Sequence, residues 1–128
     1  MRFESSLEPR LLELAITTVG ARWRSEFEFW AHSRLALEAG ISTEIIDALA
    51  AGEPPVFTNA DEEAIYVYTM SLSRDGHVSQ MIYDGAVAAV GVDSVVDLTH
   101  TIGYYGHISL LLNAFEVALP AAAHPRFT

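Results

Sequence analysis

Residues that start or stop helices recur along this chain at intervals of one short helix, and this punctuation constrains the fold most strongly. Between the breaks, apolar residues return with helical spacing, as they do in the first segment at Leu11, Leu12, Ala15, Ile16 and Val19. No segment of useful length alternates apolar and polar residues as a half-buried strand does. The pattern predicts an all-α protein, a six-helix bundle that forms a single domain over residues 1–128.

The breaks also predict where the helices lie. Pro9 fits the first turn of a helix that runs to about Arg22. Ser25 opens a second helix, which stops at Gly40. The other helices are expected from Ser42 to near Gly52, from Thr58 or Asn59 to about Arg74, from Ser79 to Gly91, and from about Asp93 to Val117. Pro120 ends the last helix, and residues 121–128 are expected to form a loose tail.

Two helices carry more apolar surface than one small domain can cover. The sixth is apolar on nearly every side, so we expect it to be buried in the domain centre or at a subunit contact. The second is rich in large aromatic residues, not all of which can point inward: Phe27, Phe29 and Trp30. Some of these are expected to meet another subunit. The chain is therefore predicted to form a homo-oligomer.

The acidic balance and the missing residue types exclude several classes of function. The formal net charge is −10, and the seven basic residues are arginines scattered singly. Neither nucleic acid nor an anionic membrane is an expected partner, because both require a basic stripe. The chain has no cysteine for thiolate chemistry and no lysine for a Schiff base. Its chemistry must come from carboxylates, imidazoles, hydroxyls or a borrowed cofactor.

The sequence also bears on where the protein acts. No apolar run approaches the ~18 residues of a membrane-spanning helix. The first residues lack the apolar stretch of a signal peptide. We expect a cytoplasmic protein without a membrane segment.

The second helix holds the first candidate for chemistry, because Glu28 and His32 lie four residues apart on the stripe expected to face the core. Burying both requires that each satisfies the other. A neighbouring carboxylate would raise the pKa of the histidine and prepare it as a general acid. A structural alternative is open for each residue. Glu28 is also the third residue of a Ser-x-x-Glu capping box that starts at Ser25, and His32 fits a purely structural role.

Further candidates lie on the first and sixth helices. Glu13 has small and apolar neighbours, so it either faces a pocket or is a partly exposed acid at a helix edge. His100, Tyr104 and His107 share one helix face, beside glycines that would let a ligand approach. Two histidines seven residues apart on one helix cannot chelate one ion, so we predict no metal.

Four segments of the chain resemble a known family in collinear order. Residues 10–16 (RLLELAI) and 26–32 (EFEFWAH) resemble the RLRELAI…EYEWAHH signature of carboxymuconolactone decarboxylase-like proteins. Residues 74–79 (RDGHVS) look like the start of that family's fifth helix. Residues 101–105 (TIGYY) and 112–114 (LNA) are similar to its TIGYY…LNA segment. The match extends from about residue 8 to residue 120.

The resemblance implies an all-helical fold of the alkyl hydroperoxidase D-like type, assembled into trimers or hexamers with active sites near the subunit contacts. Glu28 and His32 match a Glu-x-x-x-His pair of the decarboxylase branch. Glu13 and His32 match a proton-relay pair of the hydroperoxidase D-like branch. In that second branch, Ser25 and Glu28 stand where the two cysteines of a CxxC motif would be. Cysteine-dependent peroxidase activity is therefore not expected.

Sequence and resemblance together lead to an expected activity. We expect an enzyme without a cofactor that carries out proton transfer or decarboxylation on a small carboxylate or lactone substrate. Its acid–base residues would be His32 and Glu28, with Glu13 or His107 as a second proton carrier. The candidate substrate contacts are His107, Tyr104, His100 and Phe29. Two alternatives are open: another cofactor-free lyase, isomerase or cyclase, and a non-catalytic oligomeric module that binds small molecules.

Overall fold

The computed structural model describes residues 5–127, which form six α-helices and no strand. The helices are α1 (Pro9–Arg22), α2 (Glu26–Ala39), α3 (Thr43–Ala51), α4 (Ala60–Asp75), α5 (Gln80–Val90) and α6 (Val92–Ala114). The prediction of an all-α protein with six helices is confirmed. The predicted bounds of α1 are those observed, and the bounds of α2 to α5 agree to within a residue or two.

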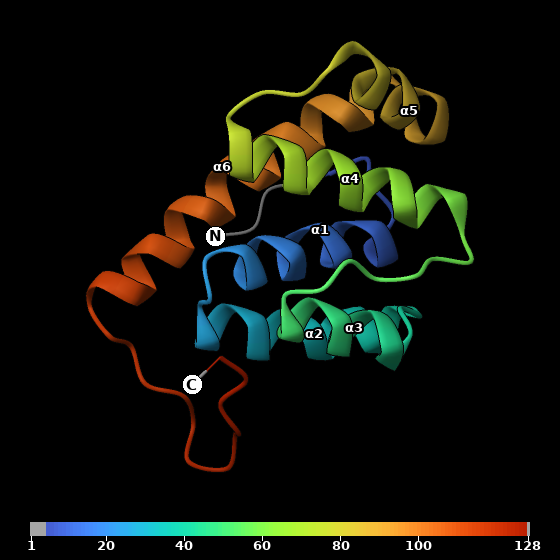
Figure 1. Ribbon diagram of the computed structural model, residues 1–128. Coiled ribbons are helices and arrows are strands. Elements are labelled where there is room, and N and C mark those ends of the chain that lie inside the picture. The colour runs from blue at the N-terminus through green and yellow to red at the C-terminus, as the bar shows by residue number, and fades with distance from the viewer. Residues whose placement is uncertain (1–4, 128) are drawn as a thin grey trace.

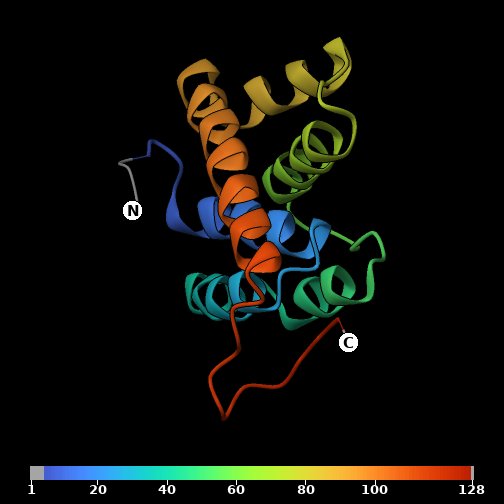
Figure 2. The same ribbon diagram turned by 90° about the vertical axis from the view of Figure 1, so that its left-hand side faces the viewer.

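Helix α1 forms the centre of the molecule. In Figure 1 it lies between the α2–α3 pair on one side and α4 on the other. Figure 2 shows α6 crossing the same region from a third side. Every residue of α1 from Leu11 to Gly20 is buried, which is the expected consequence of neighbours on three sides. Helix α5 packs on the outer ends of α4 and α6 and buries only Ala86.

Two glycines show how local sequence determines this arrangement. Gly40 ends α2 with φ of +113°, a left-handed conformation that costs a residue with a side chain more than it costs glycine. Gly20 lies where α1 meets α2, and a Cβ atom there would be 3.2 Å from the backbone nitrogen of Phe29. The missing side chain therefore lets the two helices approach closely near their shared corner.

The C-terminal part of the chain differs from expectation. Helix α6 ends at Ala114 rather than at Val117. Its C-terminal half is not buried in the domain centre, because Leu110 is 48% exposed and Leu111 is 41% exposed. None of the helices within residues 5–127 has the length and apolar character that a bilayer crossing requires.

The expected loose tail is also corrected, as far as residues 121–127 are described. The carboxylate of Glu26 accepts hydrogen bonds from the backbone N–H groups of Arg126 and Phe127, at 2.8 and 3.1 Å. The ring of Phe127 is buried and meets the ring of Phe29 edge to face, with centroids 5.2 Å apart. The tail thus folds back over the start of α2, which Figure 1 shows below the bundle.

Candidate functional site

The imidazole of His32 lies between two buried carboxylates. Its Nδ1 atom is 2.6 Å from Oε1 of Glu13, and its Nε2 atom is 3.2 Å from Oε1 of Glu28. The side chains of Glu13 and Glu28 are 3% and 5% exposed, whereas that of His32 is 14% exposed. The predicted Glu28–His32 pair therefore forms, and α1 adds Glu13, which completes a cluster of three ionisable groups across the α1–α2 contact.

The spacing of α1 explains why Glu13 meets α2. Glu13 and Gly20 are seven residues apart, so they lie on one face of α1, two turns from each other. Gly20 lets the backbone of α2 come close at one end of this face, where its Cβ position is 3.4 Å from Cγ of Glu28. The Glu13 carboxylate then reaches His32 one turn further along α2. A single glycine thus permits the helix contact on which the cluster depends.

The charge of His32 depends on opposing effects. Burial by itself lowers the pKa of His32, but the hydrogen bonds to Glu13 and Glu28 and the charges of both acids outweigh burial and raise the pKa to about 9. At neutral pH the ring is therefore an imidazolium, and each ring nitrogen carries a proton that a carboxylate can accept. The expectation that a carboxylate partner raises the pKa of this histidine is confirmed.

Glu28 is not the cap of α2, so the structural alternative for this residue is wrong. Within the described chain, the side chain of Ser25 makes no capping hydrogen bond, and its backbone N–H donates to the carbonyl of Gly20. Glu28 reaches forward to His32 instead. The core-facing side of α2 also includes Ser33, which is buried, whereas Leu35 is 39% exposed.

The candidate residues on α6 have different surroundings in the structure. Tyr105 packs edge to face against the His32 ring with centroids 5.2 Å apart, and Tyr104 packs against Tyr105 rather than against the histidine. His100 and His107 are exposed. Tyr105, which the sequence analysis did not select, is the tyrosine that contacts His32. The buried spacing of Leu98, Ile102, Tyr105 and Ser109 is the signal that identifies the inward face.

Phe29 does not line an open surface. Its side chain is fully buried in the hydrophobic core, where it meets Phe127. A small molecule cannot reach this ring while the core is packed. The structure therefore moves Phe29 from the candidate substrate contacts to the core of the α2 side of the protein.

Three other buried polar atoms stand out near the cluster. Among residues 5–127, Oγ of Ser25, Oε2 of Glu28 and Oγ of Ser109 have no hydrogen-bond partner. Such atoms are rare in native proteins, because each one loses its hydration without compensation, at a cost of roughly 1–3 kcal/mol. Ser25 and Ser109 were not selected as site residues from the sequence. Ser25 was noted only as a capping residue and at a position where the resemblance places a cysteine, and Ser109, in an apolar helix, carries no local signal for such a role.

Two hollows flank this part of the molecule. One of about 390 Å³ lies between the start of α2 and the end of α6, and is lined by Arg24, Ser25, Glu26, Phe27, Leu112, Asn113, Glu116 and Val117. The other, of about 530 Å³, includes His107 and Trp23 and lies on the α4 side of α6. Among residues 5–127 no group of three histidine, aspartate or glutamate side chains is arranged to hold a metal ion.

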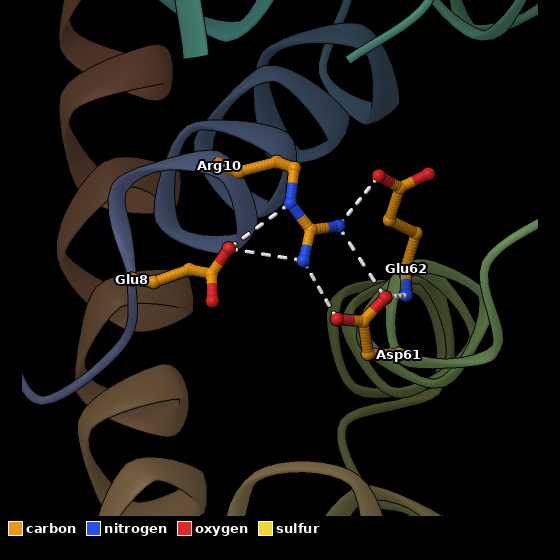
Figure 3. A network of polar contacts seen from close by, with 4 residues as sticks. All are labelled: Glu8, Arg10, Asp61 and Glu62. Atoms are coloured by element: carbon orange, nitrogen blue, oxygen red, sulfur yellow. Dashed lines mark hydrogen bonds and ion pairs between the residues drawn. The ribbon is translucent and has the colours of Figure 1, made fainter. Parts of the chain in front are cut away.

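A second charged cluster surrounds Arg10, which lies three residues before Glu13 on α1. Figure 3 shows the guanidinium of Arg10 surrounded by Glu8, Asp61 and Glu62. Its Nη1 atom is 2.6 Å from Glu62, and its Nη2 atom is 2.7 Å from Asp61 and 2.9 Å from Glu8. The hydrogen bond from Arg10 lowers the pKa of Asp61. This arrangement holds the start of α1 against the start of α4.

Comparisons of the chain with protein-family models, with curated proteins and with solved structures give no match.

Proposed function

We propose that this protein is an enzyme without a cofactor that transfers protons on a small carboxylate or lactone substrate, with His32 as its acid–base residue. The observation that carries the proposal is the imidazole held between two buried carboxylates. This arrangement keeps the ring protonated at neutral pH, so that it can donate a proton. Strongly shifted titrations of this kind concentrate at functional sites.

Decarboxylation of a β-keto acid is the reaction that best fits these groups. The bond to the carboxylate breaks, carbon dioxide leaves, and the electron pair moves onto the ketone oxygen to give an enolate. The enolate carbon then takes one proton, from His32 directly or through Glu28, and solvent returns a proton to the histidine. No lysine imine is needed, because the ketone of the substrate accepts the electrons.

The same groups agree with the resemblance to carboxymuconolactone decarboxylase-like proteins. Glu13, Glu28 and His32 match acid–base residues of two branches of that family, and all three meet in one cluster here. The absence of cysteine excludes the thiol chemistry of the hydroperoxidase D-like branch. Membership of this family, with its alkyl hydroperoxidase D-like fold type, is part of the proposal. Another lyase, isomerase or cyclase reaction would use the same residues.

The assembly we propose is a homo-oligomer, a trimer or a hexamer. Its support is the apolar side chains that α6 exposes, which include Val92, Val96, Leu110 and Leu111. Light scattering on the purified protein tests this part of the proposal. A particle mass of three or six times 14.0 kDa supports it, and a stable species of one chain contradicts it.

The test of the proposed chemistry removes one charge from the cluster. Glu28→Gln keeps the shape of the side chain, so melting should change little, while the pKa of His32 should fall. Decarboxylation of acetoacetate, the simplest β-keto acid, should slow by about 10²-fold. His32→Gln should cause a similar loss, and the double variant should lose no more than either single one, because residues that act as a unit are not additive.

Glu38→Gln is the matched control, since Glu38 is an exposed acid on the same helix. It should leave the His32 titration and the turnover unchanged. A His32 pKa that does not move in Glu28→Gln would contradict the pairing. A pKa that moves without any turnover by the native protein would favour the non-catalytic binding module, in which the cluster serves only to hold α1 against α2.

A further inference from the structure

A hollow of about 250 Å³, here called the α1–α3–α4 hollow, lies beside the C-terminal half of α1. Helices α1 and α3 both end on this side of the molecule, at the left in Figure 1. Arg22 lines the hollow and is nine residues after Glu13, about two and a half turns, so the two residues lie on opposite sides of α1. The hollow is therefore separate from the His32 cluster. Its lining residues are Thr18, Ala21, Arg22, Arg24, Leu49, Gly52, Glu53, Tyr66 and Met70.

Arg22 brings an unsatisfied cation to this hollow. Its Nε atom is buried without a hydrogen-bond partner, and within residues 5–127 its guanidinium forms no ion pair. The guanidinium stacks on the ring of Trp23, with its central carbon 4.5 Å from the ring centroid. Stacking covers one face of the group but does not satisfy its N–H donors, which point outward in its plane. Arg22 therefore retains both charge and donors for a ligand.

Arg24 provides a second cation from an unusual backbone position. It follows α1 with φ of +53°, a left-handed conformation that glycine usually supplies after a helix and that costs a residue with a side chain. Its Nη2 atom donates to the carbonyl of Phe127, and its other donors are not used by this contact. Backbone strain of this kind concentrates at ligand sites. The side chain that is present here in place of glycine lines the same hollow as Arg22.

The charges around the hollow favour an anion. Of the described lining residues, Arg22 and Arg24 are cations and Glu53 is the one acid, which is exposed. Burial raises the pKa of Tyr66, so its phenol is uncharged at neutral pH. The ends of α1 and α3 add partial negative charge, but backbone N–H groups of Ser25 and Glu53 donate to carbonyls in their last turns and reduce it. An excess of positive charge thus gathers at one place in a protein with a formal net charge of −10.

The remaining lining is mostly apolar. Ala21, Leu49 and Met70 contribute aliphatic surface, and the ring of Tyr66 packs against that of Phe57 with centroids 5.4 Å apart. Sites for small molecules commonly combine such a lining with a few polar groups that orient the ligand. The occupant that fits should have an apolar body and one negative charge.

We propose that the α1–α3–α4 hollow binds a small monocarboxylate with an apolar body, whose carboxylate is held by Arg22 and Arg24. A guanidinium binds a carboxylate through charge-assisted hydrogen bonds, which are stronger than those between neutral groups. This site is additional to the proposed function, because it lies on the other side of α1 from His32. A ligand here contacts three helices of the folded state, so it should also raise the melting temperature.

Benzoate and benzamide provide matched probes, since they have nearly the same size and shape but only benzoate carries a charge. We would titrate each into the full-length protein and follow the backbone amide NMR signals of Thr18, Gly52 and Met70. Benzoate should shift all three signals, and benzamide should bind at least about tenfold more weakly. Acetate has the same charge without the ring, so it too should bind at least about tenfold more weakly.

Three variants test the charged residues of the hollow. Arg22→Met and Arg24→Gly should each weaken benzoate binding by about tenfold. Arg24→Gly places glycine at a left-handed position, so the fold should be retained. Glu53→Gln should strengthen benzoate binding by about two- to threefold, because it removes the acid that lines the hollow. A purely structural role of the two arginines does not predict this gain.

Arg34→Met is the matched control for Arg22→Met. Arg34 also stacks on a tryptophan, with its central carbon 5.1 Å from the ring centroid of Trp30, but it does not line the hollow. The two variants change the net charge equally, and Arg34→Met should leave benzoate binding unchanged. His32→Gln should also leave it unchanged, because the His32 cluster is separate from the hollow.

Several results would overturn the inference. No binding of benzoate, or equal binding of benzamide or acetate, would reject the proposed ligand class. Unchanged binding in both Arg22→Met and Arg24→Gly, or no gain in Glu53→Gln, would reject the proposed contacts. Equal losses in Arg34→Met and Arg22→Met would show that binding follows net charge alone, and loss of binding in His32→Gln would place benzoate at the His32 cluster instead.

Discussion

The two charged clusters on α1 are built from similar parts but differ in their capacity to react. Each places one cation of α1 or α2 among carboxylates, two around His32 and three around Arg10. All three nitrogens of the Arg10 guanidinium have a carboxylate partner (Figure 3). In the His32 cluster, by contrast, Oε2 of Glu28 has no hydrogen-bond partner among the described residues.

The cations differ as well. Arginine keeps its proton at every pH a folded protein experiences, so the Arg10 cluster can hold helices together but cannot exchange protons. The two carboxylates raise the pKa of His32 to about 9, within reach of reversible proton transfer. Burial and ion pairing alone thus do not mark a functional site. A titratable cation beside an unsatisfied oxygen is the more informative combination.

Removing the arginine should cause the largest change in stability. Arg10→Met leaves the Glu62 carboxylate, whose side chain is 3% exposed, without its cation. We expect the free energy of unfolding to fall by about 3–4 kcal/mol, because an unpaired buried charge is costly. Urea unfolding at pH 7 measures this loss. The pKa of His32 should stay near its native value, since Glu13 and Glu28 raise it and Arg10 does not contribute.

Arg74→Met is the matched control for this loss. The Arg74–Asp75 pair is exposed, with side chains 60% and 45% accessible, so its removal should cost no more than about 0.5 kcal/mol. Equal losses in the two arginine variants would show that the Arg10 cluster contributes no more than a surface ion pair, and would weaken the comparison.

Above pH 6.5, the dependence of stability on pH should report on the His32 cluster rather than on the Arg10 cluster. The pKa of His32 is about 9 in the folded protein, against an ordinary value of 6.5 for histidine. Between these two pH values the folded state binds more protons than the unfolded state. The stabilisation that His32 contributes is therefore fully present below pH 6.5 and is lost as the pH rises through 9. The loss should be about 2–3 kcal/mol. His107→Gln, at an exposed position, should show the same loss, whereas Glu28→Gln should show a smaller one.

The helices could be predicted because their boundaries are local. Gly40, Gly52 and Gly76 each adopt a positive φ directly after a helix, and this preference belongs to glycine in any context. The end of α6 has no such residue, and the prediction was wrong by three residues there. The docking of the tail on Glu26 joins groups about a hundred residues apart, so no local pattern could indicate it.

Some contacts of the candidate site could likewise be predicted from a local pattern, and others could not. The Glu28–His32 contact spans four residues of one helix, and spacing alone predicts it. The contact of Tyr105 with His32 depends on the rotation of α6, which an almost uniformly apolar helix does not encode. The unsatisfied hydroxyl of Ser109 depends on what α6 packs against, and tertiary structure alone reveals it.

The two acids of the His32 cluster should contribute unequally to its titration. Oε1 of Glu13 is 2.6 Å from the ring, against 3.2 Å for Oε1 of Glu28, and a shorter charge-assisted hydrogen bond is the stronger one. Glu13→Gln should therefore lower the pKa of His32 more than Glu28→Gln does, as NMR titration of the ring would show. If Glu28→Gln lowered the pKa of His32 as much as Glu13→Gln or more, the shorter distance to Glu13 would not make Glu13 the stronger partner of the imidazolium.

The smallest change in stability should come from removing the charge of Glu8, the exposed carboxylate of the Arg10 cluster. The Glu8 side chain is 57% exposed and pairs with Arg10 at 2.9 Å, whereas Glu62 makes its pair in the protein interior. Glu8→Gln should cost no more than about 0.5 kcal/mol in urea unfolding, because water solvates the charge when the pair is lost. Glu62→Gln should cost several times more, although Asp61 still holds the arginine at 2.7 Å. Similar losses in both variants would show that burial does not make the Glu62 pair stronger than the Glu8 pair. Burial would then also be no reason to expect strong pairs between His32 and its two acids.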